Sequence, residues 1–157
     1  MRIKLFVFVF LFALVSVYAS AAIVNGSVPN KGQKKYSLKP GVAGWANVLL
    51  TNSVAAADLD VYISFVDDNG QEQFIGISTS SARQIEKLTV GVDSVSQFYV
   101  YVVSYTGSSA FRLAVTVEGD VSGSARPSQF ELREVPIDAQ SSRVIERAQK
   151  IQRSLKQ

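Results

Sequence analysis

Hydrophobic and polar side chains alternate one by one along most of the chain between residues 34 and 118. Such alternation places one set of side chains on each face of an extended strand, with the apolar set toward a core. The pattern predicts about seven strands separated by turn residues: Lys35–Leu38, Trp45–Thr51, Leu59–Phe65, Phe74–Ile77, Ile85–Val90, Phe98–Val103 and Phe111–Val117. The pair Asn69-Gly70 marks a hairpin turn. We therefore expect an all-β protein, an antiparallel β-sandwich with a jelly-roll-like arrangement.

The period of the pattern changes near the C-terminus. Residues 119–136 have the composition of a linker, with one extra strand expected at 130–135, and residues 137–157 follow a helical period. The apolar positions of this helix, spaced at i, i+4, i+7 and i+11, are Val144, Ala148, Ile151 and Leu155. One amphipathic α-helix, with Asp138 or Ser141 as its cap, is expected to close the chain. It has three alternative partners: the sandwich itself, another copy of the chain, or an anionic membrane surface.

The N-terminus has the features of an export signal. Arg2 and Lys4 precede the uninterrupted apolar run Leu5–Val15, and the small residues Ala19-Ser20-Ala21 follow it. A basic start, an apolar run of this length and an A-x-A site are typical of a secretory signal peptide.

Residues 1–21 are therefore expected to be removed by cleavage before Ala22, with cleavage before Ser20 as the alternative. An uncleaved membrane anchor is the competing interpretation of the same run. Residues 22–33, rich in Asn, Gly, Pro and Ser, are expected to form a loose leader. The mature protein is expected to be secreted, periplasmic or held at the cell surface.

The composition excludes several kinds of chemistry. The chain has no His and no Cys, which rules out Ser-His-Asp and Cys-His catalysis, imidazole or thiolate metal sites, and disulfides. Residues 22–137 carry nine basic and eleven acidic side chains, whereas residues 138–157 carry five basic and two acidic ones. This division into an acidic body and a basic tail is not that of a nucleic-acid-binding face. We expect no nucleic-acid partner, and membrane contact only through the C-terminal helix.

Four segments resemble a known family. Asp58–Ile63 has a D-x-D-x-Y pattern, Ile77–Ser80 is a Ser-rich turn followed by Gln84–Glu86, Phe98–Gly107 is rich in aromatics, and Ala110–Val117 is a closing strand. Over residues 34–118 the chain resembles the bacterial and archaeal pre-peptidase C-terminal domains. The resemblance implies a β-sandwich of the kind attached to exported enzymes, some of which bind collagen or polysaccharide and some of which hold calcium. We expect this chain to depart from the family in having no catalytic domain beside the module.

The tyrosines are the candidate ligand-binding residues. If Phe98, Val100 and Val102 face the core, the tyrosines of the neighbouring positions share the opposite face. The predicted set is Tyr62, Tyr99, Tyr101 and Tyr105. Rows of exposed tyrosine provide flat, amphipathic contact area. The alternative is that the strand near residue 130 or the tail helix covers them.

Two acidic pairs are weaker candidates. Asp58 and Asp60 lie on one face of a strand, and Asp67 and Asp68 lie in the following turn. Clustered carboxylates can hold calcium or act as the acid and base of glycoside hydrolysis. Neither pair has a full ligand set or two contrasting environments, so we expect solvated strand edges and caps, no metal and no catalysis.

The sequence as a whole predicts an exported, non-enzymatic binding module without a cofactor. Its partner is expected to be an extracellular or envelope protein or polysaccharide, recognised through the tyrosine-bearing sheet face. Two alternatives stay open. One is a structural surface or filament subunit that oligomerises through edge strands or the tail helix, and the other is an accessory subunit of an exported hydrolase.

Overall fold

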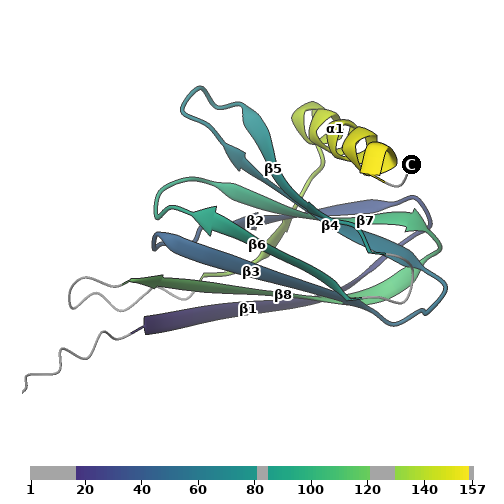
Figure 1. Cartoon of the computed structure of the whole chain (residues 1–157), viewed down its shortest axis with the longest axis horizontal. Coiled ribbons are helices and arrows are strands. Elements are labelled where there is room, and N and C mark those ends of the chain that lie inside the picture. The colour runs from purple at the N-terminus through teal and green to yellow at the C-terminus, as the bar shows by residue number, and fades with distance from the viewer. Residues whose placement is uncertain (1–16, 81–84, 121–129, 156–157) are drawn as a thin grey trace, which may run out of the picture.

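Two antiparallel sheets face each other, and a helix covers the outside of one of them (Figure 1). The computed structural model describes residues 17–80, 85–120 and 130–155. The strands are β1 (Val17–Val28), β2 (Gln33–Leu38), β3 (Gly44–Asn52), β4 (Asp58–Val66), β5 (Glu72–Ser78), β6 (Glu86–Val92), β7 (Phe98–Thr106), β8 (Ser109–Asp120) and β9 (Arg133–Val135), and the helix is α1 (Ala139–Leu155). One sheet has the order β1-β8-β3-β6 and the other the order β5-β4-β7-β2-β9. The predicted β-sandwich with one C-terminal amphipathic helix is confirmed.

The core lies between the two sheets and is built from the alternating apolar positions. Val61 and Ile63 of β4 and Val100 and Val102 of β7 point inward from the five-stranded sheet, and Val115 of β8 meets them from the other sheet. Each of these side chains is almost fully buried. Because strand side chains alternate between faces, the residues between these core positions lie on the outer faces of the two sheets.

The expected loose leader at residues 22–33 is wrong. Residues 17–28 form β1, which pairs with β8 along its whole length, from Val17 opposite Asp120 to Val28 opposite Ser109. Ala22 and Val24 pack against the core, and Val28 is buried within it. These alternate apolar positions outweigh the turn-forming residues between them, and the real turn follows β1, where the Gly32 amide donates to the Pro29 carbonyl at 2.8 Å.

The first 16 residues, with the predicted apolar signal run, lie outside the described residues. The predicted cleavage sites fall inside β1, so Val17–Ala21 belong both to the expected signal peptide and to the strand. Within the described part of the chain, no helix is long and apolar enough to cross a membrane.

The segment expected to be a linker is partly ordered into the sandwich. β8 continues to Asp120, and β9 pairs with β2 at the opposite edge of the five-stranded sheet. Phe130 and Leu132, just before β9, are buried in the core. Residues 121–129 lie outside the described residues.

α1 docks on the outer face of the five-stranded sheet, over β4 and β5. Its first turn is capped by Asp138, whose Oδ1 accepts hydrogen bonds from the Ser141 amide and the Ser141 hydroxyl, each at 2.8 Å. The amide bond is the main reason why the pKa of Asp138 lies below its usual value. Of the predicted apolar stripe, Val144 and Ala148 are buried and Ile151 is half-buried. Ile145, which was not part of the predicted stripe, is buried as well.

Candidate functional site

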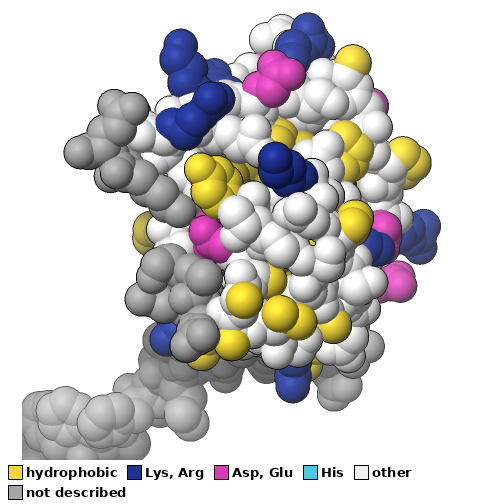
Figure 2. All heavy atoms as spheres, turned by 90° about the vertical axis from the view of Figure 1, so that its right-hand side faces the viewer, with side chains coloured by type: hydrophobic (Ala, Val, Ile, Leu, Met, Phe, Trp, Pro, Cys, Tyr) yellow, Lys and Arg dark blue, Asp and Glu magenta, His cyan; other side chains and the backbone are white. Residues whose placement is uncertain are grey.

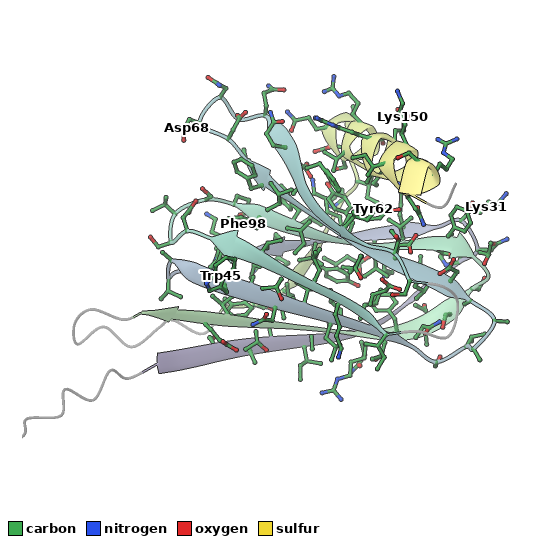
Figure 3. The ribbon with its side chains drawn as sticks, viewed as in Figure 1. Lys31, Trp45, Tyr62, Asp68, Phe98 and Lys150 are labelled. Atoms are coloured by element: carbon green, nitrogen blue, oxygen red, sulfur yellow. The ribbon has the colours of Figure 1, made fainter. Side chains whose placement is uncertain are left out.

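The predicted tyrosine face lies beneath α1. Tyr62 and Tyr101 have no exposed surface, and they pack with Val103 of β7 and with Val144, Ile145 and Ala148 of the helix. Figure 3 shows Tyr62 between the sheet and the helix, with Lys150 on the opposite, outward side of α1. Burial raises the pKa of both phenols well above its ordinary value.

A buried ion pair joins this face to the start of the helix. Lys35 Nζ of β2 lies 2.9 Å from Glu72 Oε2 of β5, and both side chains are almost wholly enclosed. The same ammonium group donates to the Ser141 hydroxyl of α1 at 2.7 Å. Glu72 Oε1 accepts from the Ser64 hydroxyl and from the Tyr101 phenol. Buried charges of this kind need complete pairing, so the network fixes where α1 sits.

A second buried network holds the other end of the helix. Gln152 Nε2 donates to Asp60 Oδ2 at 2.6 Å, and Gln152 Oε1 accepts from the Tyr62 hydroxyl at 3.1 Å. Asp60, which the sequence offered as half of an acidic pair, therefore ties the helix to the sheet. Its partner Asp58 is also buried.

The tyrosine face is therefore not an open surface, which corrects the expectation that a ligand meets it directly. Tyr99 is half-buried, with Lys35 Nζ 3.6 Å from the centre of its ring, and Tyr105 is 43% exposed. The physical reason is that the apolar side chains of α1 pack on Tyr62 and Tyr101. Ligand binding by the four tyrosines stays a prediction, and with α1 in place only Tyr99 and Tyr105 are accessible.

The second acidic pair lies in the β4–β5 hairpin. Asp67 Oδ1 accepts from the amides of Asn69 and Gln71, and Asp67 Oδ2 accepts from the Gln73 side chain. These hydrogen bonds, led by that from Gln71, lower the pKa of Asp67. The hydrogen bonds of the turn account for the position of the Asp67 carboxylate without a bound ligand. The neighbouring Asp68 is exposed to solvent. The described residues hold no group of three or more acidic side chains that would suit a metal ion.

Among the described residues, nothing covers the outer face of the four-stranded sheet. Trp45 of β3 is 61% exposed there, between Gly91 of β6 and Glu118 of β8 in the sheet register. A Cβ atom at Gly91 would lie 3.9 Å from the indole, so the ring stands beside a position without a side chain. Exposed Ile23 of β1 extends the face across the sheet. No described element packs over these side chains, and Figure 3 labels Trp45 on this layer.

A shallow hollow of about 280 Å³ lies on the same face and begins at Asn47, two positions beyond Trp45 in β3. Its lining side chains that point outward come from three strands: Asn47, Leu49, Lys87, Thr89, Ala114 and Thr116. Asn47 Oδ1 accepts from the Thr89 hydroxyl at 2.8 Å, and Asn47 Nδ2 lies 3.4 Å from Glu118 Oε1. The face thus combines an exposed aromatic ring with hydroxyl, amide, ammonium and carboxylate groups.

This face was not expected from the sequence, although the chain carries the signal for it. Trp45, Asn47 and Leu49 alternate with Ala46, Val48 and Leu50, and the second set is buried. The alternation therefore places Trp45 outside, although tryptophan is highly buried on average in folded proteins.

No family model matches the chain, and no curated protein matches its sequence. Several solved structures are similar in fold. The crystal structure of a mitogen from Yersinia pseudotuberculosis aligns with a TM-score of 0.53 and 13% identity, over 72% of this chain and 95% of that chain. The pre-peptidase C-terminal domain of a Bacillus anthracis collagenase aligns with a TM-score of 0.49 and 13% identity, over 61% and 89%. A family 22 carbohydrate-binding module of Clostridium thermocellum aligns with a TM-score of 0.39 and 15% identity, over 73% and 92%.

At 13% identity the mitogen alignment shows a shared sandwich fold and nothing about function. The two weaker alignments carry no functional argument. Membership of the pre-peptidase C-terminal family stays a prediction.

Proposed function

We propose that this protein is a non-catalytic binding module that recognises an extracellular or envelope protein or polysaccharide through the outer face of its four-stranded sheet. The observation that carries the proposal is the exposure of Trp45, the only tryptophan of the chain, on a face that no described element covers. A large aromatic side chain left in water on a flat sheet is typical of a contact surface.

The neighbours of Trp45 suit either kind of partner. An indole face can stack on the apolar side of a sugar ring or enter a pocket of a protein surface. Asn47 and Thr89 offer both donors and acceptors, Glu118 accepts, and Lys87 donates. An aromatic contact next to polar groups is common in binding sites.

Three further parts of the proposal come from the sequence. The basic start and apolar run support export, and the absence of His and Cys supports a role without catalysis. The four motif segments support membership of the pre-peptidase C-terminal family.

The tyrosines provide a second candidate surface, favoured by the exposure of Tyr105 at the end of β7. Tyr99 is the nearest of the other predicted residues that solvent still reaches. Tyr62 and Tyr101 join this surface only in a state in which α1 has left the sheet.

The test is a comparison of three proteins on glycan and matrix-protein arrays: the unchanged chain, Trp45→Ala and Tyr105→Ala. Removal of a central aromatic contact costs about 2 kcal/mol or more, so Trp45→Ala should weaken binding roughly 30-fold. Tyr105→Ala removes one exposed aromatic ring from the second candidate surface, so the two variants distinguish the two sites. A loss of binding in Tyr105→Ala with unchanged binding in Trp45→Ala would show that the ligand binds at the tyrosine surface. Multimers dispersed by Trp45→Ala in light scattering would favour the structural-subunit alternative.

A further inference from the structure

A row of basic side chains follows the exposed side of α1. Arg143, Arg147 and Lys150 stand at i, i+4 and i+7, so they share one face of the helix. All three are exposed, and none has a carboxylate partner among the described residues. Lys34 and Lys35 on the sheet, in contrast, each have one. Figure 2 shows basic side chains gathered in its upper part, at the height of α1.

A groove of about 270 Å³ runs between this row and the edge strand β5. Gln71 and Phe74 line it from the side of β5, and Gln140, Arg143 and Arg147 from the side of the helix. The Gln140 side chain donates to the Gly70 carbonyl at 3.2 Å, which ties the mouth of the groove to the hairpin.

The groove has a positive character because its one carboxylate is already engaged. Glu72 belongs to the lining, but its oxygens are bound by Lys35, Ser64 and Tyr101. Its charge is matched by the Lys35 ammonium group at 2.9 Å. The two guanidinium groups of the lining therefore face an incoming ligand, and exposed Glu146, next to Arg147 on α1, lowers the net positive charge of the row.

We propose that this groove binds an acidic polysaccharide, a chain of sugar rings that carry carboxylate or sulfate groups. Arginine side chains pair with planar oxyanions through two parallel hydrogen bonds. The amides of Gln71 and Gln140 can bond ring hydroxyls, and the half-exposed Phe74 ring can contact the apolar side of a sugar. Arg143 and Arg147 lie ~6 Å apart along the helix axis and Lys150 continues the row, so successive charged groups of one chain can be held together.

A membrane surface fits these observations less well. A helix that binds a membrane places its apolar face among the lipids. The apolar side chains Val144, Ile145 and Ala148 of α1 are already buried against the sheet. The exposed side presents charged and polar groups, which suits a hydrated polymer.

The test is isothermal titration of the full folded chain with polygalacturonate and with heparin at several salt concentrations, with dextran as the neutral polymer. We expect binding to both acidic polymers, weakening as salt rises, and no binding to dextran. The variant Arg143→Gln/Arg147→Gln should bind about tenfold more weakly, since it removes two charge contacts. The variant Lys39→Gln/Arg133→Gln removes the same net charge from exposed positions outside the groove and should change affinity by less than about twofold.

Several outcomes would overturn the proposal. These are equal losses in the two double variants, an absence of binding to either acidic polymer, or tighter binding to polyglutamate or to vesicles of anionic lipid than to the polysaccharides. Circular dichroism of each variant shows whether the fold is kept, which is expected because all four positions are exposed. Trp45→Ala should leave this binding intact, so failure here and failure of the proposed Trp45 site are separate results.

Discussion

Gln152 of α1 and Asp60 of β4 meet between the helix and the sheet, where the Gln152 amide donates to the Asp60 carboxylate at 2.6 Å. Both side chains are almost fully buried, and 92 positions separate them along the chain. The contact joins the last turns of α1 to β4. Buried polar bonds therefore hold α1 on the sheet in addition to the packing of its apolar side chains.

Replacement of Gln152 should loosen this contact. In Gln152→Ala, the Asp60 carboxylate and the Tyr62 hydroxyl each lose a buried partner, and the expected cost is about 2–3 kcal/mol in the free energy of unfolding. Urea denaturation followed by circular dichroism measures it. Gln149→Ala, on the same helix and only half-buried, should change stability by less than about 0.5 kcal/mol. Equal effects of the two variants would show that α1 is held without this bond.

Two neighbouring lysines should differ sharply in importance. Lys35→Met leaves the buried Glu72 carboxylate without its cation, at an expected cost of about 3–5 kcal/mol. Lys34→Met breaks a pair with Glu134 in which both side chains are partly exposed, at a cost of about 1 kcal/mol or less. Thermal and urea unfolding of the two variants side by side measure the difference. Similar losses would mean that the Lys35–Glu72 pair is not enclosed in solution.

The buried phenols make stability fall at high pH. Burial, with a smaller effect of Glu134, raises the pKa of Tyr36 from 10.0 to about 12. The unfolded chain therefore loses its phenol proton first, so this stabilisation is full below pH 10.0 and is lost as the pH rises toward about 12. Tyr62 and Tyr101 act in the same direction. Urea midpoints measured across this range, together with phenolate absorbance, check the slope.

The variant Tyr36→Phe measures how much the Tyr36 phenol contributes to the fall of stability at high pH. The Tyr36 hydroxyl is buried without a hydrogen-bond partner in the described structure, so the variant loses no bond. We expect unchanged or higher stability at neutral pH and a shallower decline above pH 10.0. A loss of more than about 1 kcal/mol at neutral pH would reveal a partner for the hydroxyl.

Two glycines of the open sheet should respond differently to alanine. At Gly44 of β3 a Cβ atom would overlap the Glu118 carbonyl oxygen and lie 2.7 Å from Gly119 Cα, and backbone atoms cannot move aside cheaply. Gly44→Ala should therefore cost about 2–3 kcal/mol. Gly91→Ala meets only the edge of Trp45 at 3.9 Å and should be nearly neutral. Denaturant midpoints of the two variants measure these changes in stability. A Gly44→Ala variant as stable as the unchanged protein would show that β3 and β8 are less closely paired at Gly44.

The sandwich could be predicted because a period of two is explicit in the sequence, as in Leu59–Phe65. β1 was missed because Asn25-Gly26-Ser27 has turn chemistry, and only its pairing with β8 keeps that segment extended. The covering of Tyr62 could not be predicted, since an apolar helix stripe does not specify the surface on which it packs. Lys35 and Gln152 have the composition of surface residues, and they are buried only through partners far away in the sequence.

The most direct test of the account is the fluorescence of Trp45 during titration with the tightest array ligand whose binding is unchanged in Arg143→Gln/Arg147→Gln. Trp45 is the only tryptophan, so the signal reports on the open sheet face alone. The account predicts a shift of the emission to shorter wavelength and protection from acrylamide quenching, both saturating with ligand. A ligand that binds tightly and leaves the emission and the quenching of Trp45 unchanged would contradict it.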